Sequence, residues 1–561
     1  MPPITGAGAC LSRTPPGAAM PRWSAGGACR RDAVAGERRN GAGGSAVEAS
    51  QTRRESTVNA SSERSRSLWG KSATADAPPL AADATADVAV IGAGIAGLSV
   101  AYELARAGRS VIVLDRGPIG GGMTARTTGH LASELDDYYH VLIEARGIDA
   151  AREVCAAQAA AVDRIEAIVR EERIDCDFAR LDGYLFPAPE TDPAVLEKEH
   201  AAAPRRPSRP RARPGAPIPG LRSGRALRFP NQGRFHPLKY LNGLIGCLGG
   251  AGVRLHGGTT VNDVAEQEDG TVLVRTEAGA SAHVGACVVA TNAPFNEVEV
   301  HYKQAPYRTY AIAARVPRGS VADALFWDTL DPYHYVRLQP AEDGSDWLIS
   351  GGEDHKSGEA DDMEARLARL ESWTRTLFPG LGEVEHRWSG QVMESVDYAA
   401  LIGRSPTGRN IYMATGDSGQ GLTNAVAASL IISGLILGRE VPYGPAHDPQ
   451  RAVRGAVKEF IAENVDAVAK LAAKLTPGEV GSIEEIPFGE GAILRQGLSK
   501  LAVYRDESGK PCKRSAACTH AGCIVQWNPF EKCWDCPCHG SHFAPDGTAI
   551  NAPAVAPLED A

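Results

Sequence analysis

Cysteine and histidine stand together in two short boxes near the C-terminal end of this 561-residue chain. The first box holds Cys518 and His520, and the second holds Cys536 and His539. Two thiolates and two imidazoles could hold one metal ion or one cluster. A zinc site of the Cys2His2 kind usually groups cysteine with cysteine and histidine with histidine. Because each box here carries one of each, the pattern favours a [2Fe–2S] centre with two cysteines on one iron and two histidines on the other. Zinc remains the alternative.

A glycine-rich turn supplies the second chemical motif. Gly92, Gly94 and Gly97 form G-x-G-x-x-G directly after a short apolar strand and before an amphipathic helix. A second apolar strand then ends at Asp115. In such a unit the glycines permit a tight turn, close approach of a pyrophosphate and close helix packing, while the acid accepts hydrogen bonds from a ribose. The sequence therefore predicts a dinucleotide site.

The two C-terminal boxes, CTHAGC and CPCHGS, resemble those of a Rieske iron–sulfur domain. The resemblance covers about the last eighty residues. It implies that Cys518, His520, Cys536 and His539 are the cluster ligands, and that Cys523 and Cys538 form a disulfide, as in the cytochrome bc type of Rieske protein. It also implies that one of the two histidines faces the next electron acceptor.

Two further positions of the Rieske pattern bear on the potential of the cluster. Ser541 resembles a serine of the family that hydrogen-bonds a cluster sulfur and raises the potential. Phe543 stands where high-potential members carry a tyrosine, and it has no hydroxyl to donate. We therefore expect a potential in the middle or lower part of the range of roughly −150 to +300 mV.

The N-terminal motif and three later glycine-rich segments resemble the FAD-dependent D-amino-acid oxidase superfamily. The segments are Gly117–Leu131, Val288–Phe295 and Met413–Gly438. They are most similar to the branch that oxidises glycine, sarcosine and glutamylputrescine, in which forms fused to a Rieske domain occur. The resemblance implies that FAD is held by Gly92, Gly94, Gly97, Asp115, Arg116, Thr127, Thr128, His130, Gly416, Asp417, Gly419, Gly421 and Leu422.

Residues 305–400 alternate like an antiparallel sheet, which in this superfamily forms the substrate domain over the flavin. The catalytic residue itself stays unknown from the sequence. His130, Tyr335 and Arg387 are the candidates, and each could equally be an ordinary structural residue. Other groups that could line the pocket are Tyr333, His334, Arg337, His355 and Trp388.

The expected fold is an α/β, Rossmann-type FAD-binding domain with an antiparallel substrate sheet, plus a small all-β Rieske domain. We expect a disordered extension over residues 1–75, the FAD domain over 83–445 with its sheet at roughly 300–400, a helical connector over 446–478, and the Rieske domain over 479–561. The Arg- and Pro-rich residues 201–219 cannot be a helix or a central strand.

Composition narrows the class of partner. A net charge of −9 gives no reason to expect nucleic acid. The longest apolar stretch, Asn424–Gly438, is shorter than the roughly 18 residues of a membrane span. No apolar segment follows Arg30-Arg31 or Arg38-Arg39, so no secretory signal fits. We expect a cytoplasmic protein.

The two resemblances together imply an enzyme that oxidises an amine or amino-acid-like substrate on FAD and passes electrons through the Rieske cluster to an external acceptor, either a quinone or a redox protein. No second G-x-G-x-x-G occurs between residues 120 and 300, which argues against NAD(P)H as the reductant. Three alternatives remain open: a reductase that receives electrons through the cluster, a flavin monooxygenase, and a non-catalytic redox sensor.

Overall fold

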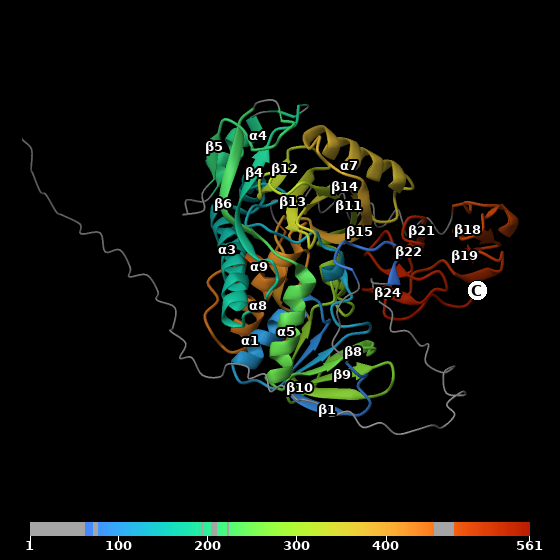
Figure 1. Ribbon diagram of the computed structural model, residues 1–561. Coiled ribbons are helices and arrows are strands. Elements are labelled where there is room, and N and C mark those ends of the chain that lie inside the picture. The colour runs from blue at the N-terminus through green and yellow to red at the C-terminus, as the bar shows by residue number, and fades with distance from the viewer. Residues whose placement is uncertain are drawn as a thin grey trace, which may run out of the picture. The chain divides into compact units, whose positions relative to one another are not determined.

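The computed structural model describes residues 62–70, 77–189, 191–192, 194–203, 210–221, 224–453 and 476–561. All of them belong to the second of the two units into which the chain divides, Ala46–Ala561 (Figure 1). Most of the extension expected over residues 1–75 lies outside the described residues. So do residues 454–475, which make up most of the expected helical connector.

The first sheet is built around β1 and is mainly parallel. Strand β1 pairs in parallel with both β10 and β2, and β10 and β2 pair in parallel with β17 and β7. Antiparallel pairs add β16 at one edge and the β8–β9 hairpin beside β10. The strands are β1 (Ala84–Ile91), β2 (Val111–Leu114), β7 (Arg254–His256), β8 (Val261–Glu266), β9 (Val272–Thr276), β10 (Ser281–Val289), β16 (Leu401–Arg404) and β17 (Ile411–Thr415).

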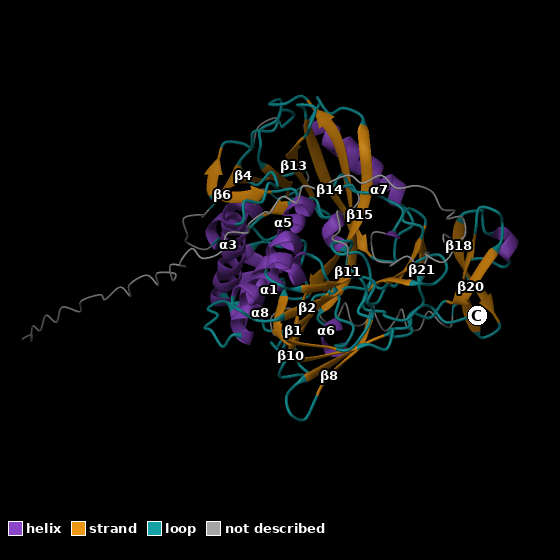
Figure 2. Ribbon diagram, turned by 60° about the horizontal axis from the view of Figure 1, so that its bottom comes forward, coloured by secondary structure: helices purple, strands orange, loops and turns teal. Residues whose placement is uncertain are grey.

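The side chains of alternate β1 residues are buried on opposite faces of this sheet, as the two-residue period of a strand requires. Val88 and Val90 pack among helices that gather on one side of the strands (Figure 2). Ala89 and Ile91 pack on the other side, against β8 and β9. The covering helices are α1 (Ile95–Arg106), α3 (Ile148–Glu171), α5 (Pro237–Gly250) and α8 (Gly421–Ile436). Coverage of both faces explains the continuous apolar runs.

The second sheet has the strand order β15-β11-β14-β13-β12-β4-β6-β3, with β5 paired to β6. Helix α7 (Met363–Leu377) packs on β11 and β14 (Figure 1). The strands are β3 (His130–Leu131), β4 (Ala179–Phe186), β5 (Arg211–Arg213), β6 (Ala226–Arg234), β11 (Gln304–Val316), β12 (Leu325–Asp328), β13 (His334–Pro340), β14 (Asp346–Lys356) and β15 (Val384–Ser395).

This sheet is larger than the segment expected at residues 300–400. Strands β3, β4, β5 and β6 extend it with residues from 130–234, and β4 joins β12 in parallel. Among the described residues of the Arg-rich segment 201–219, Ala201 and Ala202 end helix α4, which corrects the exclusion of a helix at its start. The segment also contributes β5, an edge strand with β6 as its partner, which agrees with its exclusion from the sheet interior. The remaining helices are η2 (Met123–Arg126), α2 (Tyr139–Arg146), α4 (Ala194–Ala202), α6 (Val298–His301), α9 (Gly444–His447) and η4 (Ile483–Glu485).

The C-terminal region is all β, as expected. Two antiparallel sheets run in the orders β18-β19-β20 and β21-β22-β23-β24. Their strands are β18 (Glu490–Gln496), β19 (Ser499–Arg505), β20 (Pro511–Ser515), β21 (Gln526–Asn528), β22 (Cys533–Asp535), β23 (His542–Phe543) and β24 (Ala549–Asn551).

Residues 62–70 correct the expectation of disorder up to residue 75. Glu63, Ser65 and Trp69 are buried. The Trp69 indole N–H donates to the carbonyl of Thr127 at 2.5 Å, and the Ser65 amide donates to the Glu531 carboxylate at 2.9 Å. The segment therefore packs against two distant parts of the chain, although its composition of Ser, Arg and Glu carries no apolar periodicity.

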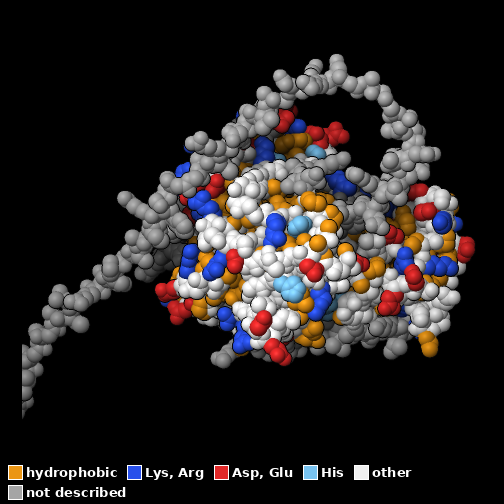
Figure 3. All heavy atoms as spheres, turned by 90° about the horizontal axis from the view of Figure 1, so that it is seen from below, with side chains coloured by type: hydrophobic (Ala, Val, Ile, Leu, Met, Phe, Trp, Pro, Cys, Tyr) orange, Lys and Arg blue, Asp and Glu red, His pale blue; other side chains and the backbone are white. Residues whose placement is uncertain are grey.

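Two observations concern the surface. Among the described helices, none is both long and apolar enough to cross a membrane. On the face seen in Figure 3, acidic and basic side chains are interspersed. That face therefore presents a mixed charge pattern.

Candidate cofactor and substrate site

The glycine turn has the geometry that its spacing predicts. Gly92 follows β1 with φ +101°, and a Cβ there would lie 2.4 Å from the Ala290 carbonyl oxygen. A Cβ on Gly97 would lie 1.9 Å from the Gly92 carbonyl oxygen, so only glycine lets α1 pack this closely. Asp115 accepts hydrogen bonds from the Ala93 and Gly117 amides at 2.7 and 2.8 Å. The acid therefore stands beside the N-terminus of α1.

A cavity of about 280 Å³ opens at the carboxyl ends of β1, β2, β10 and β17 and continues along the second sheet. This is the place where open α/β sheets bind their ligands. The second sheet contributes Thr309, Tyr335 and Trp388 to its wall. A third part of the wall, Ile550 to Ala552, comes from the C-terminal region.

Most of the residues predicted to hold FAD line this cavity: Gly92, Gly94, Asp115, Arg116, Thr127, Thr128, His130, Asp417, Gly419, Gly421 and Leu422. Gly97 supports the turn from behind, and Gly416 sits in the turn before α8 with φ +65°. The bare glycine turn, the helix N-terminus and the acid at the end of β2 fit a dinucleotide. Arg116 also contacts the C-terminal region, because its guanidinium donates to the carbonyls of Ala549 and Ala554 at 3.3 and 3.1 Å.

Two of the three catalytic candidates meet at the cavity. The rings of His130 and Tyr335 are edge-on with centroids 5.1 Å apart. Burial lowers the pKa of His130 to about 3, so its imidazole is neutral at neutral pH. Its Nδ1 lies 3.1 Å from the Thr128 hydroxyl, and its buried Nε2 has no hydrogen-bond partner among the described residues. Burial also raises the pKa of the Tyr335 hydroxyl. Both groups therefore meet the cavity uncharged.

The third candidate, Arg387, lies elsewhere. Its side chain is 39% exposed and pairs with Glu364 at 3.0 Å, and it is not among the described residues that line the cavity. Neighbouring residues of a strand point to opposite faces, and here Trp388 takes the cavity side. The same rule separates His334 from Tyr333 and Tyr335. His334 packs between carboxylates behind the sheet, while the two tyrosines line the cavity.

The other two pocket candidates, Arg337 and His355, also lie outside the cavity wall formed by the described residues. Arg337 is buried and donates to the carbonyls of Thr128 and Phe235 at 2.7 and 3.1 Å, so it braces the loop that precedes β3. The Nε2 atom of His355 lies 2.9 Å from the Tyr310 hydroxyl. Both side chains act in the framework rather than in the cavity wall.

Carboxylates in the cavity wall form a group that sequence reasoning missed. Glu134 and Asp136 line the cavity beside Asp417, which had been assigned to the flavin. Burial raises the pKa of Asp136 to about 6 and that of Asp417 to about 6. Glu134 is 2% exposed, and neither of its carboxylate oxygens has a hydrogen-bond partner among the described residues.

The predicted cluster ligands lie in two neighbouring loops, one between β20 and β21 and one between β22 and β23. The thiols of Cys518 and Cys536 hydrogen-bond each other, and the rings of His520 and His539 lie 5.0 Å apart. The Nδ1 atom of His520 is buried without a hydrogen-bond partner in the described part of the chain. Two thiols side by side and two imidazoles side by side fit a two-iron cluster better than a single ion.

The surroundings of these loops also follow the resemblance. A disulfide joins Cys523 and Cys538, as implied. The Ser541 hydroxyl hydrogen-bonds Cys518, which fits its expected contact with a cluster sulfur. Phe543 is fully buried.

The two cluster histidines face the flavin-binding part of the protein. His301 of α6 lies with its ring centroid 4.7 Å from that of His520 and 4.9 Å from that of His539. The Nε2 atom of His301 is 2.8 Å from the Pro294 carbonyl, in the segment after β10 that lines the cavity at Asn292 and Phe295. The cluster histidines therefore make an internal contact through His301, and the expectation that one of them faces an external acceptor stays a prediction.

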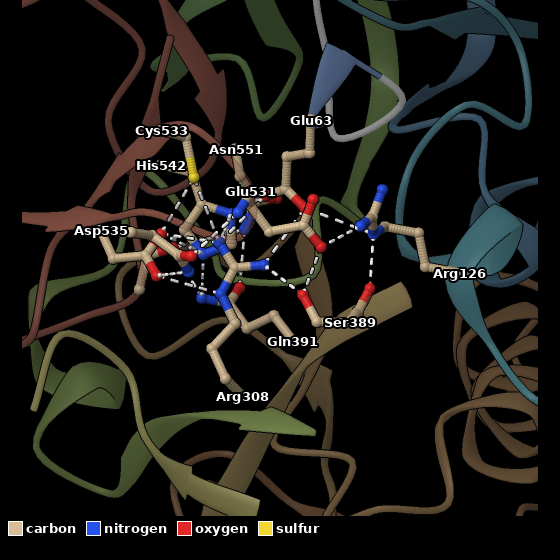
Figure 4. A network of polar contacts seen from close by, with 12 residues as sticks. Glu63, Arg126, Arg308, Ser389, Gln391, Glu531, Cys533, Asp535, His542 and Asn551 are labelled. Carbon is tan, nitrogen blue, oxygen red and sulfur yellow. Dashed lines mark hydrogen bonds and ion pairs between the residues drawn. The ribbon is translucent and has the colours of Figure 1, made fainter. Parts of the chain in front are cut away.

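A buried ion-pair network joins residues 62–70, the flavin-binding part and the C-terminal region (Figure 4). Arg308 of β11 donates to Glu63 at 3.1 Å and to Asp535 of β22 at 2.6 and 3.1 Å. Arg126 pairs with Glu531 at 2.5 Å and with Glu63 at 3.3 Å. Burial would raise the pKa of Glu63, but Arg308 and Arg126 hold that pKa well below its usual value. The carboxylate stays ionised in the interior.

Gln391 of β15 lines the cavity and also contacts the second cluster loop. Its side chain lies beside Asn551 in Figure 4. Its amide N–H2 donates to the Gly540 carbonyl at 2.8 Å, between His539 and Ser541 in sequence. Its amide oxygen accepts from Asn292 at 3.0 Å and from Asn551 at 2.6 Å. One side chain thus spans cavity wall and cluster loop.

Comparison with known proteins places these sites in two families. Residues 87–435 match the family described as FAD dependent oxidoreductase, and residues 477–561 match the Rieske [2Fe-2S] domain. YhfW of Bacillus subtilis, whose name describes a Rieske 2Fe-2S iron-sulfur protein, is 30% identical over 86% of this chain and 94% of its own. Gamma-glutamylputrescine oxidoreductase of Escherichia coli is 26% identical over 67% of this chain and 90% of its own. Glycine oxidase of Geobacillus kaustophilus shares the fold, with a TM-score of 0.54, 16% identity, and coverage of 66% of this chain and all of its own.

Proposed function

Because the chain belongs to the FAD dependent oxidoreductase family and ends in a Rieske [2Fe-2S] domain, we propose that it is a dehydrogenase that exports electrons through its own cluster. The substrate would be an amine or amino-acid-like molecule. The final acceptor would be an external quinone or redox protein.

FAD would supply the hydride acceptor and the Rieske cluster a one-electron carrier, so that the amine loses two electrons and two protons, and water then hydrolyses the imine product. The glycine turn and Asp115 would bind the nucleotide half of FAD. Neutral His130 and the Tyr335 hydroxyl would orient the reacting amine in the cavity. The loops at Cys518 and Cys536 would hold the cluster.

One observation carries the proposal. The cavity that contains the glycine turn is also lined by Ile550, Asn551 and Ala552 of the Rieske domain. Arg116, at the end of β2, donates to carbonyls of the same domain. A cluster domain built into the wall of the flavin site supports direct electron exchange between the two cofactors rather than two independent activities.

Two contacts support a defined route between the sites. The His301 ring touches both cluster histidines, and the backbone carbonyl next to the cavity holds its Nε2. Gln391 provides a second bridge to the cluster loop. His301 and Gln391 would fix the position of the cluster relative to the flavin, because both side chains contact the two parts at once.

An anaerobic titration of the holoprotein with secondary amines and amino acids tests the proposal. Flavin absorbance and the EPR signal of the reduced cluster would be followed in the same samples. Bleaching of the flavin followed by growth of a Rieske signal supports the outward path. A Cys536→Ser variant provides the matched control, since its flavin should still bleach without a cluster signal.

Other outcomes would contradict the proposal. Flavin reduction by NADPH would favour a monooxygenase. A cluster that accepts electrons from a ferredoxin-like donor and then reduces the flavin would favour the reverse direction. A protein whose cofactors respond to dithionite but to no amine would favour a sensor.

A further inference from the structure

Part of the cavity wall is acidic. Glu134 and Asp136 come from the loop after β3, and Asp417 comes from the loop before α8. The Tyr333 hydroxyl donates to Asp136 at 2.7 Å, and the carboxylate of Glu134 has no such donor in the described residues. Burial and the neighbouring Glu199 raise the pKa of Glu134 well above its usual value, which favours the protonated acid. A cationic ligand beside it would favour the ionised carboxylate instead.

More carboxylates stand close to this wall. Burial and the neighbouring Asp136 raise the pKa of Asp137 to about 7. Burial and Asp137 raise the pKa of Glu394 well above its usual value, and Asp354 is raised to about 7 by burial, with Asp136 adding to the rise. Burial is the largest cause of these rises and the neighbouring carboxylates add to it, so these acids would ionise more readily with a cation beside them.

The basic groups nearby are already engaged. Arg116, Arg126 and His130 are the basic side chains among the described residues that line the cavity. Arg116 donates to backbone carbonyls, and Arg126 pairs with Glu531. Near Asp354, Arg366 pairs with Asp362 and donates to backbone carbonyls. The wall therefore offers no uncommitted guanidinium to a substrate carboxylate.

Aromatic rings complete the surroundings. Trp327, Tyr333 and Tyr335 line the same cavity, and the two tyrosine rings lie 5.5 Å apart. Aromatic faces attract ammonium groups and bind alkyl chains. Acids combined with aromatic rings match a cationic, aliphatic ligand.

We propose that the substrate is an aliphatic diamine or polyamine, whose second ammonium group is bound by Glu134 and Asp136 within the aromatic wall. This inference rests on the proposed function, because it names the class of amine. An α-amino acid would instead bring a carboxylate next to uncompensated carboxylates.

Calorimetric titration tests the inference. The dithionite-reduced holoprotein is used, because reduced flavin cannot oxidise the ligand during the measurement. The probes are 1,4-diaminobutane, n-butylamine and sarcosine. We expect the diamine to bind at least about tenfold more tightly than either other probe, because it alone places a second ammonium against the acids.

Two variants sharpen the test. Glu134→Gln keeps the shape of the side chain and should weaken the diamine about tenfold or more while leaving n-butylamine within about twofold. Asp149→Asn is the matched control, because Asp149 is 87% exposed and paired with Arg152 on the surface. Flavin content of each variant reports whether the fold is intact.

Equal or tighter binding of sarcosine, or unchanged diamine affinity in Glu134→Gln, would overturn the inference. The anaerobic titration separates it from the proposed function. If an amino acid reduces the flavin and the diamine does not bind, the dehydrogenase assignment stands and the diamine falls. If the diamine binds but no amine reduces the flavin, the dehydrogenase assignment falls, and the acidic wall stands only as a diamine-binding site.

Discussion

Replacing Arg308 with methionine tests whether the buried network holds the Rieske domain against the flavin-binding part. Arg308 is fully buried and donates to Glu63 and Asp535 on two other segments. Methionine fills a similar space but leaves the two carboxylates close together with less compensating charge. Removing one partner of a buried ion pair costs about 3–5 kcal/mol, and we expect Arg308→Met to fall in this range.

The same strand offers a control. Arg315 of β11 pairs with Asp343 at 2.6 Å, but its side chain is 33% exposed and Asp343 is 59% exposed. Arg315→Met should therefore change stability by only about 0–1 kcal/mol. Urea unfolding is followed by flavin fluorescence and by visible circular dichroism of the cluster, because a protein with several domains need not unfold in one step.

A double variant adds a second check. Glu63→Gln combined with Arg308→Met should cost less than the two single changes added together, by about 0.5–3 kcal/mol, because the residues share one interaction. The reasoning fails if Arg308→Met is no more destabilising than Arg315→Met, or if the two costs add fully.

Three further outcomes are expected. Gly97→Ala should lower the ratio of flavin to protein absorbance, because the new Cβ would overlap the Gly92 carbonyl and such overpacking costs about 1–3 kcal/mol. Gly249→Ala is the control, because the space around its new Cβ is open, and it should leave the ratio unchanged. His301→Leu should keep the EPR signal of the cluster but slow its reduction by substrate by at least about tenfold in stopped-flow experiments, and an unchanged rate would remove His301 from the route. Burial alone would lower the pKa of His334, but hydrogen bonds to the carboxylates of Asp328 and Glu353 raise that pKa to about 9. The folded protein therefore holds this proton more tightly than the unfolded chain. The apparent free energy of unfolding should fall by up to about 3 kcal/mol as pH rises from 6.5 through 9. Urea midpoints across this pH range measure the slope, which should be smaller in His334→Gln because that variant lacks the titrating imidazole.

Local motifs made the cofactor sites predictable. The roles of Gly92, Gly97 and Asp115 depend on residues within one strand–turn–helix–strand unit, so spacing alone placed them. The cluster boxes are equally local. Their disulfide followed from the resemblance and is present between Cys523 and Cys538.

The substrate side was harder to predict, because strand alternation identifies two faces without saying which one meets the cavity. Arg387 and Trp388 are neighbours on one strand, so only one of them could line the cavity. The same holds for His334 and Tyr335. Trp388 and Tyr335 are the members of these pairs that line the cavity. The alternation rule could have halved the candidates in advance, but only tertiary packing selects the face.

The network could not be found from local patterns. Glu63 lies in a segment with a disordered composition, and Arg308 reads as one polar residue of an ordinary strand. Each residue forms its ion pairs with partners hundreds of positions away in the sequence. The sequence carries one signal, which is that Arg308 is a charged residue in a largely apolar strand. Such a residue is expected to have a buried partner of opposite charge, but the sequence does not identify that partner.

The contacts of residues 62–70 have a consequence for how the protein is made. Ser65 binds Glu531 across 466 positions of sequence, and Arg308 binds Asp535 across 227. On the ribosome the N-terminal residues emerge first, but their partners are synthesised last, so the flavin-binding part must wait for the end of translation to bury these charges. Loop closure over such separations slows folding. Expressing the two domains as separate proteins would leave Arg308 and Glu63 in one piece and Asp535 in the other, so each piece would expose charged groups that the full chain buries.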